Sequence, residues 1–168
     1  MELVERLAGM RIGGTYNQYA CSELRRRRLA AYLDSRAHAA LVLVGEAAGY
    51  RGARVSGIPF TSERQLSGDG PAEASATIMQ AVLAELGLED DVLLWNVVPT
   101  HPGTADSNRP PTCGEVAAAQ PFLETLALSR RVVAVGRLAA SATKAAYVRH
   151  PSHGGARLFR EMLCECLS

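Results

Sequence analysis

The chain has 168 residues, of which 48% are hydrophobic and 21% are charged, and its formal net charge is +1. This balance is typical of one globular domain and argues against a disordered chain or a strongly basic nucleic-acid-binding segment. No apolar run approaches the length of a membrane-spanning helix, and residues 1–10 lack the pattern of a secretory signal peptide. We therefore expect a single domain over residues 1–168, located in the cytoplasm.

Helices and strands are expected to alternate along the chain. Residues 1–8 have weak helical spacing, and Ser22 is a suitable N-cap for a helix that runs to about Asp34. Further helices are expected over 72–87, 113–128, 137–146 and 155–166, and strands over 39–45, 92–98, 131–136 and 147–149. This order predicts an α/β fold with three αβα layers around a central four-stranded parallel sheet.

Two features of the chain do not belong to this regular pattern. The segment 47–71 is too long for an ordinary connection, so we expect it to be functional or disordered, although the apolar centre of 57–62 favours an ordered segment. The four arginines Arg25–Arg28 fall within a predicted helix, where a run of charge is usually a solvated face.

The four cysteines do not form a metal-binding pattern. Cys21, Cys113, Cys164 and Cys166 contain no C-x-x-C spacing, so free thiols are the expectation in a reducing compartment. We expect neither a metal nor another cofactor.

Polar and glycine-rich residues follow three of the predicted strands. The aliphatic run 41–44 ends at Gly45-Glu46, the second strand carries Asn96, and the last short strand leads into His150-Pro151-Ser152. Because the carboxyl ends of parallel strands meet at one edge of a sheet, these residues are expected to form a ligand site there.

Five segments, taken together and in order, resemble the uracil-DNA glycosylase superfamily over about residues 40–165. They are Gly45–Gly49, Gly57–Glu63, Asn96–Val98, Asn108–Thr112 and His150–Gly155. The stretch from Asn96 to Leu123 is most similar to the iron–sulfur branch of that superfamily. The resemblance implies a uracil-DNA glycosylase-like fold.

The chain departs from the family pattern at several positions. The iron–sulfur branch has one cluster cysteine at the position of Thr100 or His101 and another at the position of Ala119 or Gln120. Because this chain has no cysteine at these positions, no cluster is expected. The best-known uracil glycosylases have a water-activating aspartate where this chain has Ala47. Ala48 likewise stands where a proline is common, which loosens the turn.

The resemblance implies a pocket for a pyrimidine flipped out of the DNA stack. Phe60 would stack on the base, or else be a core aromatic under a loop. Asn96 would read the 4-keto oxygen and the ring N–H, or else cap a strand end. His150 would donate to the 2-keto oxygen, or else be a structural histidine, and backbone N–H groups beside Gly45, at Glu46 and Ala47, would assist it.

Glu46, in the first motif, and Tyr50, just after it, each have alternative roles. Glu46 would orient the attacking water or stabilise the cationic sugar, or it would instead be a structural carboxylate. Tyr50 would wall off the 5-position of the base and exclude the methyl group of thymine, or else pack within the loop.

The contacts with DNA are expected from small polar groups and a few arginines. Ser152, His153 and Gly154, which precede the last helix, would bind one DNA phosphate at the N-terminus of that helix. Thr61 and Ser62 would contact another phosphate, and Arg149 and Arg157 would add positive charge. The expected set is Thr61, Ser62, Arg149, Ser152, His153, Gly154 and Arg157.

Together these residues predict a monomeric DNA repair glycosylase that hydrolyses the N-glycosidic bond of uracil, or of a related deaminated base, and leaves an abasic site. Two alternatives remain open. One is a non-catalytic protein that binds nucleobases or DNA, which the absence of a carboxylate at Ala47 favours. The other is a glycosylase for another damaged base, such as hypoxanthine or xanthine.

Overall fold

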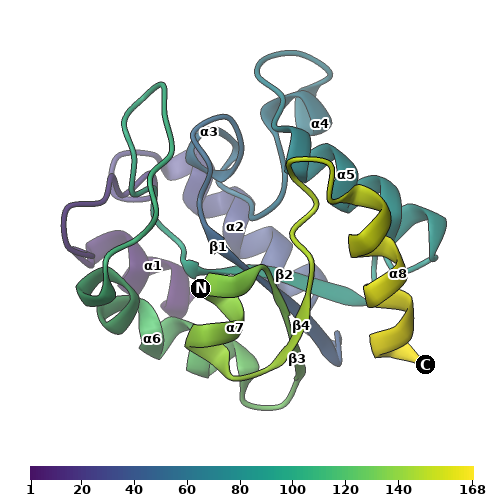
Figure 1. Ribbon diagram of the computed structural model, residues 1–168. Coiled ribbons are helices and arrows are strands. Elements are labelled where there is room, and N and C mark those ends of the chain that lie inside the picture. The colour runs from purple at the N-terminus through teal and green to yellow at the C-terminus, as the bar shows by residue number, and fades with distance from the viewer.

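The computed structural model describes residues 1–168, which form one four-stranded sheet flanked by helices (Figure 1). All three pairs of neighbouring strands are parallel, and the order across the sheet is β2-β1-β3-β4. The strands are β1 (Leu41–Ala47), β2 (Val92–Val98), β3 (Arg131–Val135) and β4 (Ala146–Val148). The predicted four-stranded parallel sheet is confirmed, and β1 extends two residues beyond its predicted end.

Helices cover both faces of the sheet, as the alternation of elements predicted. One face packs against α1 (Glu2–Gly9), α2 (Glu23–Ser35), α6 (Cys113–Ala127) and α7 (Arg137–Thr143). The other face packs against α5 (Ala74–Glu85) and α8 (Ala156–Leu167), which lie together on one side in Figure 1. No helix is both long and apolar enough to span a bilayer.

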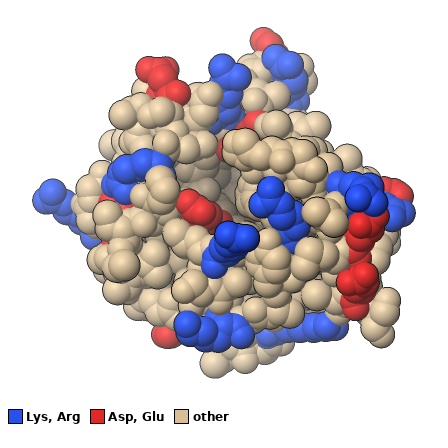
Figure 2. All heavy atoms as spheres, in the orientation of Figure 1, with Lys and Arg blue, Asp and Glu red and all other residues tan.

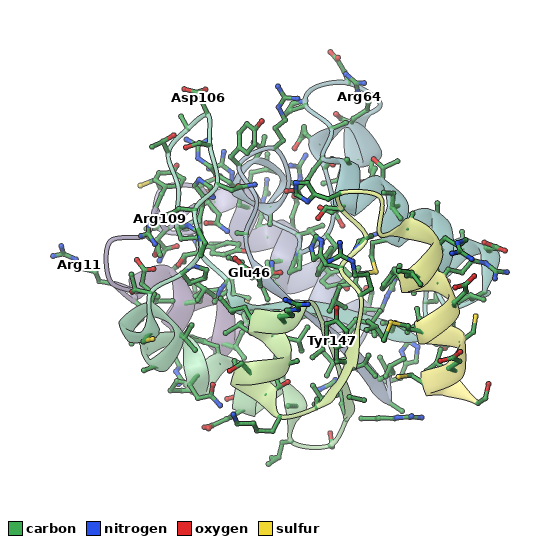
Figure 3. All side chains as sticks on the ribbon, in the orientation of Figure 1. Arg11, Glu46, Arg64, Asp106, Arg109 and Tyr147 are labelled. Carbon is green, nitrogen blue, oxygen red and sulfur yellow. The ribbon has the colours of Figure 1, made fainter.

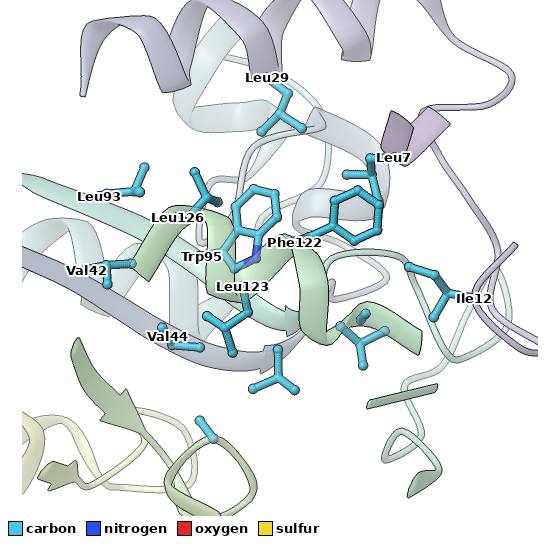
Figure 4. Packing of buried hydrophobic residues seen from close by; sticks show 14 of the residues in the cluster. Leu7, Ile12, Leu29, Val42, Val44, Leu93, Trp95, Phe122, Leu123 and Leu126 are labelled. Atoms are coloured by element: carbon cyan, nitrogen blue, oxygen red, sulfur yellow. The ribbon is translucent and has the colours of Figure 1, made fainter. Parts of the chain in front are cut away.

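The larger core surrounds Trp95 of β2, whose side chain is fully buried. Its indole packs among aliphatic and aromatic side chains from α1, α2 and α6, including Leu7, Leu29 and Phe122 (Figure 4). An aromatic side chain of this size contributes several kcal/mol through burial, so this cluster holds three helices against β1 and β2.

The alternation of side chains along β1 and β2 decides which residues face the α5 and α8 layer. Val44 and Trp95 belong to the core under α6, whereas Leu43 and Leu94 belong to the core under α5. Gly45 follows Val44 in β1 and Asn96 follows Trp95 in β2, and Gly45 and Asn96 are paired with each other across the two strands. Because successive side chains point to opposite faces, Asn96 lies on the α5 face of the sheet.

The segment 47–71 is ordered and contains two short helices that the sequence did not indicate. They are α3 (Ala53–Ser56) and α4 (Glu63–Ser67). The α3 helix ends at Gly57, which adopts a left-handed conformation with φ of 84°, and α4 begins with a capping box between Ser62 and Gln65. Each helix is about one turn long, too short to produce an amphipathic pattern in the sequence.

The interpretation of Arg25–Arg28 as a solvated face is wrong for three of the four residues. Arg25 donates to the carbonyl of Val55 at 2.9 Å, and Arg26 donates to the carbonyl of Tyr19 at 2.8 Å. Arg28 forms a two-bond ion pair with Glu63, at 2.8 and 2.9 Å. Arg25 and Arg28 thus attach α2 to α3 and α4, and Arg26 attaches α2 to the loop that precedes it.

Candidate active site

A cavity of about 920 Å³ opens at the carboxyl ends of the strands. Figure 2 shows the hollow on this face, with basic side chains around it and acidic atoms at its edge. Five of the residues expected to bind or transform the base line it, from three separate parts of the chain: Glu46, Ala47, Tyr50, Phe60 and Asn96. His150 lines it as well, so the predicted convergence at one edge of the sheet occurs.

Gly45 lies beneath this cavity and allows two of its side chains to meet. A Cβ atom at this position would overlap the ring of Phe60 and would lie 2.8 Å from Oδ1 of Asn96. Only glycine therefore allows the Phe60 ring and the Asn96 amide to sit side by side over the end of β1.

Asn96 is 3% exposed, yet its amide makes no hydrogen bond to another protein group. A polar group that is covered to this extent usually has a partner or a function. Asn96 does not cap a strand end, and its donor and acceptor are available to a ligand in the cavity.

The backbone of Phe60 is held in an uncommon conformation. Its φ of 49° lies in the left-handed region, which a bulky residue rarely adopts. The Phe60 carbonyl accepts from Gln80 at 3.0 Å, and the next carbonyl, that of Thr61, accepts from Ser56 at 2.6 Å. An uncommon backbone conformation that neighbouring groups hold in place is typical of functional sites. Here this conformation directs the Phe60 ring into the wall of the cavity.

Thr61 and Ser62 do not reach the cavity, which corrects the expectation that they contact a DNA phosphate. Both are buried, with 7% and 0% exposure. The Thr61 hydroxyl donates to the carbonyl of Pro59 at 3.1 Å, and the Ser62 hydroxyl accepts from the backbone N–H of Glu73 at 2.8 Å. These side chains fix the loop that carries Phe60.

His150 is oriented by the residues that follow it. The backbone N–H of Ser152 donates to Nδ1 of His150 at 3.2 Å, so Nδ1 is an acceptor and Nε2 carries the proton. Burial, with smaller contributions from Arg149 and His153, lowers the pKa of His150 and favours this neutral form. The ring lies 6.4 Å from that of Phe60, between centroids. His150 thus presents a neutral N–H donor to the cavity.

Glu46 is half-buried, and burial raises the pKa of its carboxyl. Figure 3 places it near the middle of the cavity face, whereas Asp106 and Arg64 lie at the outer edge of the molecule. Because it follows Gly45 directly in β1, its side chain leaves the strand on the opposite side from Asn96. The predicted carboxylate is present at the cavity, but on the α6 and α7 side of the sheet edge.

Glu73, just before α5, is a cavity residue that the sequence analysis missed. Burial raises the pKa of its carboxyl to about 7, and no hydrogen bond or ion pair to protein counters that effect. A glutamate at the start of a helix ordinarily interacts with the helix dipole, so nothing in the local sequence separated this one from a surface residue.

Glu73→Gln should stabilise the protein at pH 8 and leave its stability almost unchanged at pH 4. The folded protein keeps the Glu73 proton up to about pH 7, whereas the unfolded chain loses it near 4.5. Wild-type stability therefore falls as the pH rises through this window, by an amount on the order of 1–3 kcal/mol that the variant does not lose.

Thermal melting of both proteins at the two pH values measures this difference. Glu124→Gln, at the surface of α6, is the matched control. A Glu73→Gln protein that melts lower than wild type at pH 8 would show that the carboxylate has a stabilising partner.

The loop between β2 and α6, residues 99–112, also contributes to the wall of the cavity. Asn108 accepts a hydrogen bond from the backbone N–H of Tyr50 at 2.9 Å, which ties the two loops together. Arg109 forms a two-bond ion pair with the buried Glu115 of α6, at 2.6 and 2.8 Å, and this pair holds the pKa of Glu115 down at about 2. The backbone of Tyr50 is thereby fixed beside the cavity.

His101, at one of the positions where the iron–sulfur branch has a cysteine, is fully buried and connects loops. Its ring nitrogens lie 2.7 Å from the carbonyl oxygens of Ala48 and Thr104. It therefore tethers the turn after β1. Cys21 and Cys113 are exposed, and Cys164 and Cys166 lie within α8.

Most of the residues expected to contact DNA are at the cavity. Arg149, Ser152, His153 and Gly154 line it, whereas Arg157 does not. The Arg157 side chain is 80% exposed and pairs with Glu161 one turn along α8. Three further arginines that the sequence analysis did not select as DNA contacts line the cavity: Arg51, Arg109 and Arg137.

Comparisons with known proteins identify a family and a similar fold. The family model described as Uracil DNA glycosylase superfamily matches residues 33–163. Among solved structures, the crystal structure of wild-type Pedobacter heparinus SMUG2 is similar, with a TM-score of 0.72 and 14% sequence identity over 99% of this chain and 95% of that chain. No match was found among curated proteins.

Proposed function

The chain belongs to the uracil DNA glycosylase superfamily, and we propose that it is a DNA repair enzyme that excises uracil from DNA. The enzyme would flip the deoxyuridine out of the stack and hydrolyse its N-glycosidic bond, leaving an abasic site. Family membership supports a DNA glycosylase-type function, and the choice of uracil rests on the cavity.

The buried and unpaired amide of Asn96 carries this proposal. Beside the ring of Phe60 it can donate to the 4-keto oxygen and accept from the ring N–H of uracil. Cytosine reverses both demands, since it has a donor where uracil has the keto oxygen and an acceptor at the ring nitrogen. A mismatched base would leave buried polar groups unpaired, which can cost several kcal/mol.

The leaving base takes the electron pair of the broken bond, so its 2-keto oxygen gains negative charge. The neutral Nε2–H of His150 can donate to that oxygen. A neutral donor suits this role because it stabilises the anion without having to lose a proton. Glu46 can stabilise the positive charge that develops on the sugar.

Binding of the DNA backbone would use the arginines around the cavity. Arg51, Arg137 and Arg149 line it, and the charged groups in Figure 2 surround the hollow. A net charge of +1 provides little attraction over the rest of the surface. We therefore expect binding to weaken with salt less steeply than for a strongly basic protein.

The decisive experiment is incubation of the purified protein with single- and double-stranded oligonucleotides that each contain one uracil. Alkaline cleavage of the abasic site reports excision, and mass spectrometry of the small-molecule fraction identifies the released base. Oligonucleotides with thymine or cytosine at the same position are controls, and hypoxanthine and xanthine test the alternative substrates. Release of hypoxanthine or xanthine but not uracil would replace the proposed substrate, and release of no base would reject the proposed activity.

A further inference from the structure

We propose that Glu73 is the catalytic carboxylate that holds and deprotonates the attacking water, in place of the carboxylate that is absent at Ala47. This inference rests on the proposed glycosylase function. It assigns to the reaction a partly buried side chain that lies outside all five motifs, between the second and the third of them.

Glu73 lies on the side of the sheet where the base would bind. It precedes α5, whose apolar face packs in the same core as Phe60. Asn96 and Phe60 meet on that face, above Gly45. Glu46 leaves β1 toward the other face, so the two carboxylates approach the cavity from opposite sides.

Two glycines make room for the Glu73 carboxyl group. A Cβ atom at Gly49 would overlap Oε1 of Glu73, and one at Gly52 would overlap Oε2. Both glycines belong to the turn that follows Ala47, so the carboxyl group packs directly against the backbone of this turn. Any other residue at either glycine would displace the carboxyl group from its place in the cavity wall.

The backbone of Glu73 is anchored, whereas its carboxyl group has no partner. Its N–H donates to the buried hydroxyl of Ser62 at 2.8 Å, and its carbonyl accepts from Thr77 at 3.1 Å. The carboxyl group itself makes no hydrogen bond or ion pair with the protein, although it is mostly buried. A carboxyl that is largely removed from water and has no partner in the protein is available to substrate or water in the cavity that it lines.

The proposed step balances without another reactant. The bond between the base nitrogen and C1′ breaks, and its electron pair leaves on the base. The water oxygen bonds to C1′, and one water proton passes to Glu73. Burial, which raises the pKa of this carboxyl to about 7, suits a group that must accept a proton near neutral pH. The other titratable or charged residues of the cavity are Glu46, Tyr50, Arg51, Arg109, Arg137, Arg149, His150 and His153.

The test compares single-turnover excision of uracil by wild type, Glu73→Ala and Glu73→Gln. Both variants should lose about 100-fold or more in rate, as expected for a general base. Sodium formate should restore part of the Glu73→Ala rate, because a small carboxylate can enter the space left by the side chain. The affinity for a duplex with an abasic site should stay within about twofold. The wild-type rate should rise with pH through about 7, and the Glu73→Gln rate should not.

Glu85→Gln, at the far end of α5, is the matched control and should keep the wild-type rate. A folded Glu73→Ala protein that excises uracil at the wild-type rate would overturn the assignment and leave the glycosylase function intact. A slow variant that formate does not restore, or that binds DNA much more weakly, would also overturn it, because the residue would then only shape the pocket. If the wild type released no base at all, the proposed function would fail and this inference with it.

Discussion

His150→Ala is expected to lower the rate of uracil excision by about 100- to 1,000-fold, the loss that follows removal of one oxyanion donor. The Ser152 backbone N–H already occupies Nδ1, so the proton is on Nε2, where the 2-keto oxygen of a bound base would accept it. Alanine removes this donor when negative charge builds on the base. Single-turnover kinetics with a uracil-containing duplex measure the loss.

The same substitution should change DNA affinity little, since the hydrogen bond strengthens mainly in the transition state. His38→Ala is the control, because His38 is at the surface and pairs with Asp91 at 3.7 Å. Thermal melting must first show that His150→Ala is folded. A folded His150→Ala protein that excises uracil at the wild-type rate would show that His150 takes no part in the reaction.

Asn96→Asp is expected to weaken uracil excision by about 2–4 kcal/mol, which is roughly 30- to 1,000-fold. A carboxylate cannot donate to the 4-keto oxygen, and its charge repels the base anion as it forms. Because Asn96 is only 3% exposed, water cannot easily compensate for either effect. The measurement is kcat/KM for uracil-containing oligonucleotides.

Gln120→Glu makes the same amide-to-carboxylate change at the surface of α6 and is the control. Excision of cytosine should be measured in parallel, since an aspartate that is protonated in the pocket could accept from the cytosine amino group and donate to its ring nitrogen. Unchanged uracil excision by Asn96→Asp would place the base elsewhere in the cavity.

The sequence alone determined the order of the elements and the residues at the strand ends. These signals are local: runs of β-branched and aliphatic residues mark the strands, and Ser22 and Thr112 cap the predicted helices by accepting from the backbone N–H groups of Arg25 and Glu115. The connectivity of a parallel sheet then requires its carboxyl ends to share one edge. For this reason Glu46, Asn96 and His150 could be predicted to meet, whereas Phe60, which follows no strand, was expected beside them only from the family resemblance.

Only the tertiary structure decided which polar side chains face the cavity. Thr61 and Ser62 look like surface residues in the sequence, but α5 covers them and uses their hydroxyls. Arg25 and Arg28 look solvated, but the folded segment 47–71 supplies their partners. Glu73 looks like an ordinary first-turn acid, and only the return of α5 to the turn at Gly49 and Gly52 makes it a buried carboxyl in the cavity wall. In each case the deciding contact joins segments distant in sequence, and its direction depends on how the chain packs rather than on the residue itself.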